Sequence, residues 1–312
     1  MVNAAEVTTR NFRAVARALS CVERGGPDAE ELLSALAGRV GRARTLGVTG
    51  SPGVGKSSMV ERLGIELMAR GHGVAVLAVD PSSPFSHGAL LGDRVRMPAF
   101  VAAGGFVRSM ATRGALGGLT AATADAVDVL DAAGFDWVVV ETVGVGQDEV
   151  DVASEVETVV VVTMAGLGDD VQAAKAGIME IADVFAVNKA DRPGAENQVA
   201  VLEDMLHLAP SSAWTPPIIR TSAMSGEGIA ALLDAVIEHQ GFLDSDGKRA
   251  TLRLRRAERR IERCLHALLA EDFRGPHLEA LHRELAAVGA GRRDPYAAAR
   301  ALFGVLQAKE KP

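Results

Sequence analysis

The chain has 312 residues, enough for one large α/β domain with smaller appendages, and its 48% hydrophobic content excludes a disordered chain. A net charge of −7 argues against general nucleic-acid binding, which needs a basic surface. The cysteines, Cys21 and Cys264, form no disulfide or metal pattern, which indicates a reducing compartment. No apolar run reaches the length of a membrane span and no signal pattern is present, so we expect a soluble cytoplasmic protein without membrane or nucleic-acid partners.

Residues 1–43 are expected to form an N-terminal helical segment that either packs on the following domain or binds a partner. Apolar periodicity predicts helices over 9–20 and 28–40, separated by Gly25, Gly26 and Pro27. Asp28 is the expected N-cap of the second helix.

Residues 44–243 alternate short apolar runs with helical patterns. The runs predict strands over residues 46–49, 74–79, 137–140, 158–164, 184–187 and 218–221. Continuous apolar strands joined by helices are typical of a mostly parallel sheet with helices on both faces. The predicted class is therefore an α/β domain whose functional residues collect at the carboxyl ends of its strands.

Residues 244–312 are expected to form a C-terminal helical extension. After an Asp-Ser-Asp-Gly linker at 244–247, helices are predicted over 249–270, 276–288 and 295–307. The first combines an apolar stripe with a dense run of arginines. That run is either a solvated face balanced by Glu258 and Glu262 or an anion-binding surface, and the stripe favours an oligomerisation element.

The central motif is the sequence GSPGVGKS at residues 50–57, which fits the phosphate-loop pattern G-x-x-x-x-G-K-[ST]. The glycines let backbone N–H groups surround phosphates, Lys56 is predicted to reach the β- and γ-phosphates, and the Ser57 hydroxyl to bind Mg²⁺. The alternative is a glycine-rich turn with a chance Gly-Lys-Ser. The predicted phosphate-binding residues of this segment are Ser51, Gly53, Val54, Gly55, Lys56, Ser57 and Ser58.

A guanine-binding signal follows the predicted strand at 184–187. The sequence Asn188-Lys189-Ala190-Asp191 matches NKxD, in which a carboxylate accepts hydrogen bonds from guanine that adenine cannot supply. After the last predicted strand, Ser222, Ala223 and Met224 are candidates for a second guanine contact, unless they form only an ordinary turn. Together the two segments predict GTP rather than ATP.

Three carboxylates are candidates for the magnesium site and its catalytic surroundings. Glu141 follows the apolar run 137–140, and Gly144 after it can donate an N–H to the γ-phosphate. Gln147 is displaced from the glutamine position of Ras-like GTPases, which predicts slow hydrolysis. Asp80 and Asp93 either complete the Mg²⁺ shell on a switch segment or serve as a turn residue and a helix cap.

The motifs of residues 45–225 resemble the MeaB/ArgK/MMAA-type GTPases associated with methylmalonyl-CoA mutase, members of the SIMIBI class. The segments VDPSSPF and ETVGVGQ carry the resemblance most specifically. It implies a P-loop fold, GTP and Mg²⁺ but no tightly held organic cofactor, and a catalytic and metal set comprising Lys56, Ser57, Asp80, Asp93, Glu141 and Gln147.

The resemblance also implies a biological role: a metallochaperone whose GTP hydrolysis gates adenosylcobalamin delivery to an acyl-CoA mutase and protects or reactivates it. It further implies an adenosyltransferase as a candidate partner, and a homodimer made through the C-terminal extension. The family's partner-coupling switch matches residues 165–175 and includes Gly168, Asp169, Gln172 and Lys175. Leu167 and Asp170 depart from the expected small residue and Glu there.

Two alternatives belong to other functional classes. A P-loop kinase for a protein or small molecule would use the same phosphate loop, although no separate acceptor site or base emerges. A nickel-delivery GTPase of the same class would usually carry Cys or His clusters, whereas this chain has seven scattered histidines and two lone cysteines.

Overall fold

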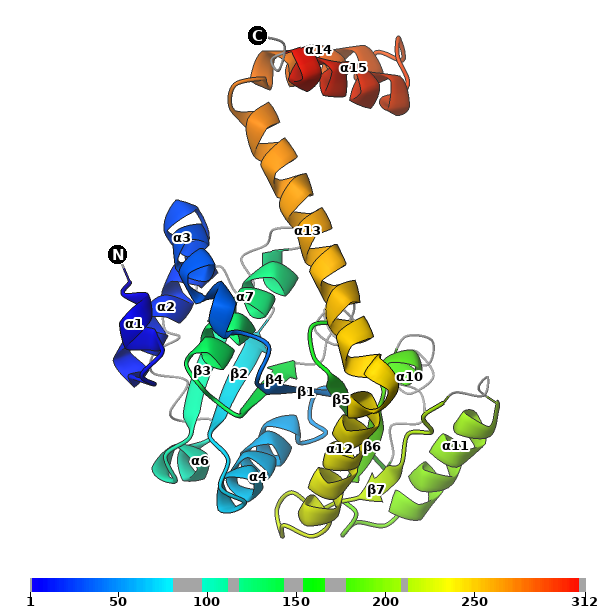
Figure 1. Cartoon of the computed structure of the whole chain (residues 1–312). Helices are drawn as coiled ribbons and strands as arrows, with labels where there is room; N and C mark the ends of the chain where they lie inside the picture. The colour runs from blue at the N-terminus through cyan, green and yellow to red at the C-terminus, as the bar shows by residue number, and fades with distance from the viewer. Residues whose placement is uncertain are drawn as a thin grey trace. The chain divides into compact units, whose positions relative to one another are not determined.

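The computed structural model describes residues 2–80, 97–111, 118–142, 154–165, 178–208 and 213–308. Its centre is a seven-stranded parallel sheet in the order β3-β2-β4-β1-β5-β6-β7 (Figure 1). The strands are β1 Arg44–Thr49, β2 Val74–Asp80, β3 Phe106–Ala111, β4 Trp137–Thr142, β5 Thr158–Met164, β6 Val184–Asn188 and β7 Ile218–Arg220. The predicted α/β class is confirmed.

Helices cover both faces of the sheet, as a parallel sheet with apolar strands requires. One apolar cluster joins the sheet to α2 (Phe12–Arg24), α3 (Pro27–Leu36), α7 (Gly118–Ala132) and α11 (Ala195–Leu208). The other joins it to α4 (Lys56–Ala69), α6 (Pro98–Ala102) and α12 (Ile229–Asp244). Strand β1 lies at the middle of the sheet between β4 and β5, so the segment that follows it starts at the centre of the sheet's carboxyl edge.

The N-terminal helices differ in detail from the prediction. A short helix, α1 (Ala4–Val7), was not predicted, and α2 begins at Phe12 because the side chain of Asn11 caps its first N–H groups. The prediction that Asp28 is the N-cap of α3 was wrong. Gly26 occupies the cap and Pro27 the first helical position, so Asp28 lies inside the first turn. Its negative charge interacts favourably there with the positive end of the helix dipole.

Strand β3 was missed because its sequence, FVRSMA, places Arg108 and Ser109 in the middle of an apolar run. Arg108 is nevertheless buried, and its guanidinium donates to Ser20 Oγ at 3.1 Å and Glu23 Oε2 at 3.2 Å, both on α2. The edge strand can therefore carry a buried charge, because two side chains of α2 accept hydrogen bonds from the Arg108 guanidinium.

The chain divides into two compact units, residues 1–253 and 254–312. Around the predicted linker, α12 ends at Asp244 and a 3₁₀ turn, η2 (Ser245–Gly247), precedes α13 (Lys248–Arg274). The second unit contains most of α13 with α14 (Leu278–Gly289) and α15 (Pro295–Ala308), and the last two pack against each other. Two short helical segments, η1 (Ala37–Arg39) and α10 (Ile178–Ile181), complete the described elements. Across the described ranges, no helix is long and apolar enough to cross a bilayer.

Candidate functional site

The phosphate loop connects the end of β1 at Thr49 with the start of α4 at Lys56. Its glycines adopt positive φ angles: 138° at Gly50, 80° at Gly53 and 99° at Gly55. A Cβ on Gly50 would lie 2.0 Å from the backbone oxygen of Val162 in β5, far inside contact distance. Gly50 is therefore required by both its backbone angle and the close approach of the neighbouring strand.

Lys56 lies inside this loop and is only 6% exposed. Its Nζ donates to the backbone oxygen of Gly50 at 2.5 Å and to that of Ser51 at 3.0 Å. The ammonium group is thus held among the loop's own peptide groups at the N-terminus of α4, where the helix dipole adds further positive potential. This combination suits a polyphosphate.

The magnesium candidates Ser57 and Glu141 meet at the same edge of the sheet. Strands β1 and β4 are neighbours in the sheet. The Ser57 hydroxyl donates a hydrogen bond to Glu141 Oε1. Beside it, Thr142 Oγ1 on β4 donates to Thr49 Oγ1 on β1 at 2.9 Å. A hydroxyl and a carboxylate oxygen side by side, next to a phosphate-binding loop, form the hard oxygen donor set that Mg²⁺ prefers. These residues fit the metal that the sequence predicts.

The remaining metal and switch predictions are only partly placed. Asp80 is the last residue of β2, beside β4, so its backbone lies at the correct edge of the sheet. The other residues predicted for the metal, phosphate and switch segments lie outside the described residues: Asp93, Gly144, Gln147, Gly168, Asp169, Gln172 and Lys175.

Asn188, at the end of β6, joins the guanine segment to the phosphate loop. Its amide Nδ2 donates to Val54 O at 2.7 Å, and its Oδ1 accepts from the backbone N–H of Ala223 at 3.0 Å. The side chain is 2% exposed, and a Cβ on Gly55 would come within 2.5 Å of its Nδ2. One amide therefore fixes the spacing between the two loops.

Lys189 and Asp191 complete the NKxD segment. Lys189 adopts a positive φ of 57°, and its Nζ donates to Gly53 O at 2.8 Å, which places its aliphatic stem over the phosphate loop. Asp191 is exposed, and the hydrogen bond from the Ser222 side chain holds its pKa below the ordinary value. An ionised, accessible carboxylate is the group needed to accept the N–H donors of guanine.

The loop after β7 has a defined internal structure. Ser222 N–H donates to Glu227 O at 2.9 Å, Gly226 N–H donates to Ser222 O at 2.8 Å, and the Ala223 N–H is engaged by Asn188. Met224 is 82% exposed at the tip. Of the three residues predicted for guanine contact, Ser222 and Ala223 thus act on Asp191 and Asn188 in this geometry.

Sequence reasoning missed Arg62, which lies on α4 six positions after Lys56. Its Nε donates to Ala223 O at 3.0 Å and its Nη2 to Met224 O at 2.9 Å. No local pattern singles it out, since an arginine on the exposed face of an amphipathic helix is ordinary.

A buried polar cluster lies at the amino end of β5, away from the phosphate loop. The Glu157 carboxylate, 4% exposed, accepts from Arg249 and, at 3.2 Å, from Arg253. His239 contacts Thr158 Oγ1 at 2.8 Å through Nδ1 and Asp183 Oδ1 at 3.3 Å through Nε2. Burial and the nearby Arg249 lower the pKa of His239 to about 4, so the ring is neutral at pH 7.

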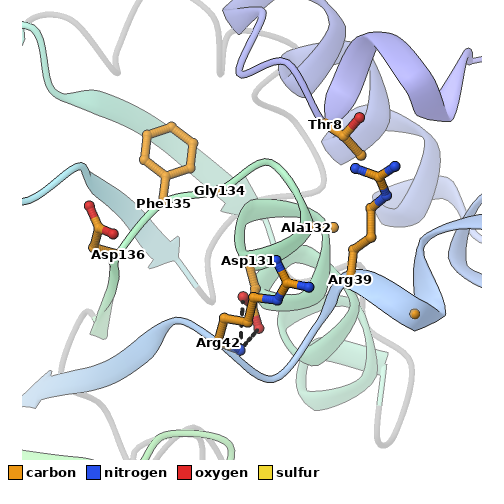
Figure 2. Close-up of a pocket in the computed structure, with 9 residues that line it drawn as sticks. Thr8, Arg39, Arg42, Asp131, Ala132, Gly134, Phe135 and Asp136 are labelled. Atoms are coloured by element: carbon orange, nitrogen blue, oxygen red, sulfur yellow. Dashed lines mark hydrogen bonds between the residues drawn. The ribbon is translucent and has the colours of Figure 1, made fainter.

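A pocket of about 480 Å³ lies where residues 38–42 approach α7 (Figure 2). The Asp131 carboxylate in its wall accepts from the backbone N–H groups of Gly41, Arg42 and Ala43, and the ring of Phe135 points away from Arg39 and Arg42. Because these residues precede β1 and β4, the pocket lies at the amino end of the strands. The Asp131 hydrogen bonds in its wall anchor the segment that enters β1.

A parallel α/β sheet with a phosphate loop after its central strand, a carboxylate on the adjacent strand and NKxD after β6 defines a P-loop GTPase. The model of the family described as methylmalonyl-CoA mutase-associated GTPase MeaB matches residues 15–276. The chain belongs to the MeaB family.

Relatives and one solved structure agree with this placement. A GTPase from Pyrococcus horikoshii is 44% identical over 92% of both chains, and the GTPase ArgK of Escherichia coli is 37% identical over 83% of both. The mouse methylmalonic aciduria type A homolog is 39% identical over 67% of this chain and 52% of its own length. A crystal structure described as a LAO/AO transport system kinase has a TM-score of 0.72 at 27% identity, covering 97% of this chain and 96% of the other.

Proposed function

We propose that this GTPase hydrolyses GTP to GDP and phosphate in order to gate adenosylcobalamin delivery to a cobalamin-dependent acyl-CoA mutase in the cytoplasm, and to protect or reactivate that mutase. Methylmalonyl-CoA mutase is the first candidate, and an adenosyltransferase is a further partner. The family description, a GTPase associated with that mutase, supports the partner. The proposal also assigns Mg²⁺ to Ser57, Asp80, Asp93 and Glu141.

The observation that carries the nucleotide part is the bridge made by Asn188. Because its amide donates to Val54 O while its carbonyl accepts from Ala223, the NKxD segment and the phosphate loop have a fixed separation. In the proposed complex the phosphates lie on the loop around Lys56 and the base lies against Asp191. When Mg²⁺ is bound, it neutralises phosphate charge and orients the γ-phosphate. We expect slow intrinsic turnover, with Gln147 displaced from the position that orients water in Ras-like GTPases.

The base assignment is tested by Asp191→Asn. An amide presents a donor where the carboxylate presents an acceptor, so preference should shift from GTP to XTP. Dissociation constants for both nucleotides, with ATP as the control, measure the shift. Unchanged preference would refute the guanine site, whatever happens with the mutase.

The role is tested by measuring phosphate release from GTP by the protein alone and with purified cobalamin-dependent mutases, while following complex formation by size-exclusion chromatography. The proposal predicts that one mutase both binds in a nucleotide-dependent manner and stimulates turnover. If GTP binds but no mutase binds or stimulates, the partner assignment fails and the nucleotide site stands.

We propose further that the C-terminal extension forms a homodimer. The apolar residues of α13 recur at heptad spacing at Leu254, Ile261 and Leu268, with Leu265 beside them, and each is more than half exposed, from 54% to 71%. A stripe of this kind is costly to leave in water and suits a helix–helix interface.

A second candidate, a P-loop kinase, is favoured by the likeness to the LAO/AO transport system kinase structure. The phosphate loop would serve either reaction. Incubation with γ-labelled GTP or ATP distinguishes the two, because a kinase transfers label to an amino acid or protein and a GTPase releases it as free phosphate.

A further inference from the structure

We propose that Arg62 is a positioning residue for guanine recognition: it clamps the loop after β7 onto helix α4, so that Ser222 and Ala223 hold the NKxD side chains in register with the phosphate loop. The inference rests on the proposed guanine site and adds a residue that no nucleotide motif contains.

The clamp is bidentate. Arg62 donates from Nε to Ala223 O at 3.0 Å and from Nη2 to Met224 O at 2.9 Å, which are 161 and 162 positions away in the chain. A planar guanidinium can hold two successive carbonyl groups at once, whereas a lysine ammonium cannot reproduce this fork. The contact therefore fixes both the position and the orientation of the loop's peptide planes.

The base of the clamp is rigid. Arg62 lies between buried residues of α4, Val60 and Leu63, both with 0% exposure, in a helix that begins with the phosphate-binding Lys56. A Cβ on Gly64 would lie 2.7 Å from the Phe100 ring, which shows how closely α4 packs against α6. The Arg62 contacts therefore tie the loop after β7 to the helix that carries Lys56.

The clamped loop in turn holds the base-reading residues. The Ser222 side chain hydrogen-bonds the Asp191 carboxylate, and the Ala223 N–H donates to Asn188 Oδ1 at 3.0 Å. Ala223 is thus held from both sides, with its carbonyl on Arg62 and its N–H on Asn188. Asp191 is exposed, and the hydrogen bond from Ser222 is the largest of the interactions that lower its pKa, so the loop contributes to the orientation of its carboxylate.

The test compares Arg62→Met, which keeps an unbranched apolar stem and removes both donors, with Arg70→Met at the C-cap of the same helix. Arg70 bonds Glu66 at 3.1 Å and Asp234 at 2.6 Å, so its loss removes two surface ion pairs but leaves the loop untouched. The readout is the ratio of the dissociation constants of IDP and GDP. IDP lacks the exocyclic amine, so the ratio reports the contact between that amine and Asp191.

We expect Arg62→Met to weaken GDP binding about tenfold and to lower the IDP-to-GDP ratio about fivefold, the order of one impaired charge-assisted hydrogen bond. Arg70→Met should leave the ratio as in the wild type. Arg62→Lys, which keeps the charge but not the fork, should give an intermediate ratio and keeps the test decisive if the methionine variant does not fold.

Equal weakening of GDP and IDP in the Arg62 variants, with an unchanged ratio, would overturn the proposal, because a purely structural role acts on both ligands alike. A matching ratio change in Arg70→Met would overturn it as well. If the wild type itself does not distinguish GDP from IDP, the guanine site of the proposed function fails, and that outcome is recognised before any variant is made.

Discussion

Replacing Gly50 by alanine should be far more costly than the same change at Gly53, although both glycines belong to the phosphate loop. Each has a positive φ, 138° and 80°, so each alanine pays about 1–2 kcal/mol of backbone strain. At Gly53 nothing lies within 4 Å of the added Cβ. Gly53→Ala is therefore expected to lose only this amount of folding free energy.

At Gly50 a second cost is added. The new Cβ would lie 2.0 Å from Val162 O and 3.0 Å from the Val162 carbonyl carbon, and both are backbone atoms of the central sheet. To restore an ordinary contact distance, β1 and β5 must separate by more than 1 Å at their hydrogen-bonded edge, which typically costs another 1–3 kcal/mol or more. The expected total is about 2–5 kcal/mol, with GDP binding lost through distortion of the loop.

Urea unfolding of the nucleotide-free proteins gives the free energies, and titration with a fluorescent GDP derivative gives the affinities. Gly53→Ala is the matched control, because it makes the same glycine-to-alanine substitution in the same loop. If the two variants unfold at the same urea concentration, the close approach of β5 does not constrain the loop, and the steric explanation is refuted.

Three further predictions concern other parts of the molecule. Lys56→Ala should weaken GTP binding by about 10- to 100-fold, because it removes charge-assisted bonds to phosphate, and wild-type affinity in a GTP titration would contradict this. His239 has its pKa lowered to about 4 from 6.5, so the unfolded chain takes up a proton first, and stability should fall by up to about 3 kcal/mol as the pH drops through this window. His239→Gln should flatten that part of the pH profile in urea unfolding, and an unaltered slope would exclude the histidine as its cause. Ile261→Asp should convert the proposed dimer to monomer in analytical ultracentrifugation, with Ala267→Asp, an exposed position on the opposite face of α13, as the control, and a persistent dimer would place the interface elsewhere.

The sequence was sufficient to predict the parallel sheet because six of its seven strands are continuous apolar runs, and burial on both faces demands that pattern. Strand β3 escaped because the ion pair between Arg108 and Glu23 is formed by residues 85 positions apart, and no local window contains it. The N-cap of α3 was assigned to Asp28 from residue preference, but Pro27 starts the helix one position earlier.

The site shows the same division between local and distant information. The phosphate loop and NKxD are contiguous strings, so their chemistry was readable from residue types alone. That Asn188 bridges to Val54, and that Ser222 acts on Asp191, depends on β6 and β7 following β1 and β5 in the sheet order. Arg62 gave no signal, because its partners are backbone carbonyls and any residue type could supply them.

The bridge made by Asn188 has a consequence for engineering. Asp191 is exposed, so a designer can exchange it to alter base preference without disturbing the fold. Asn188 offers no such freedom: it is 2% exposed, and any replacement leaves Val54 O and the Ala223 N–H buried without their shared partner. Base specificity can thus be changed by a single substitution at Asp191. Grafting the whole NKxD segment onto another protein, by contrast, would require grafting the phosphate loop as well, because Asn188 bonds to it.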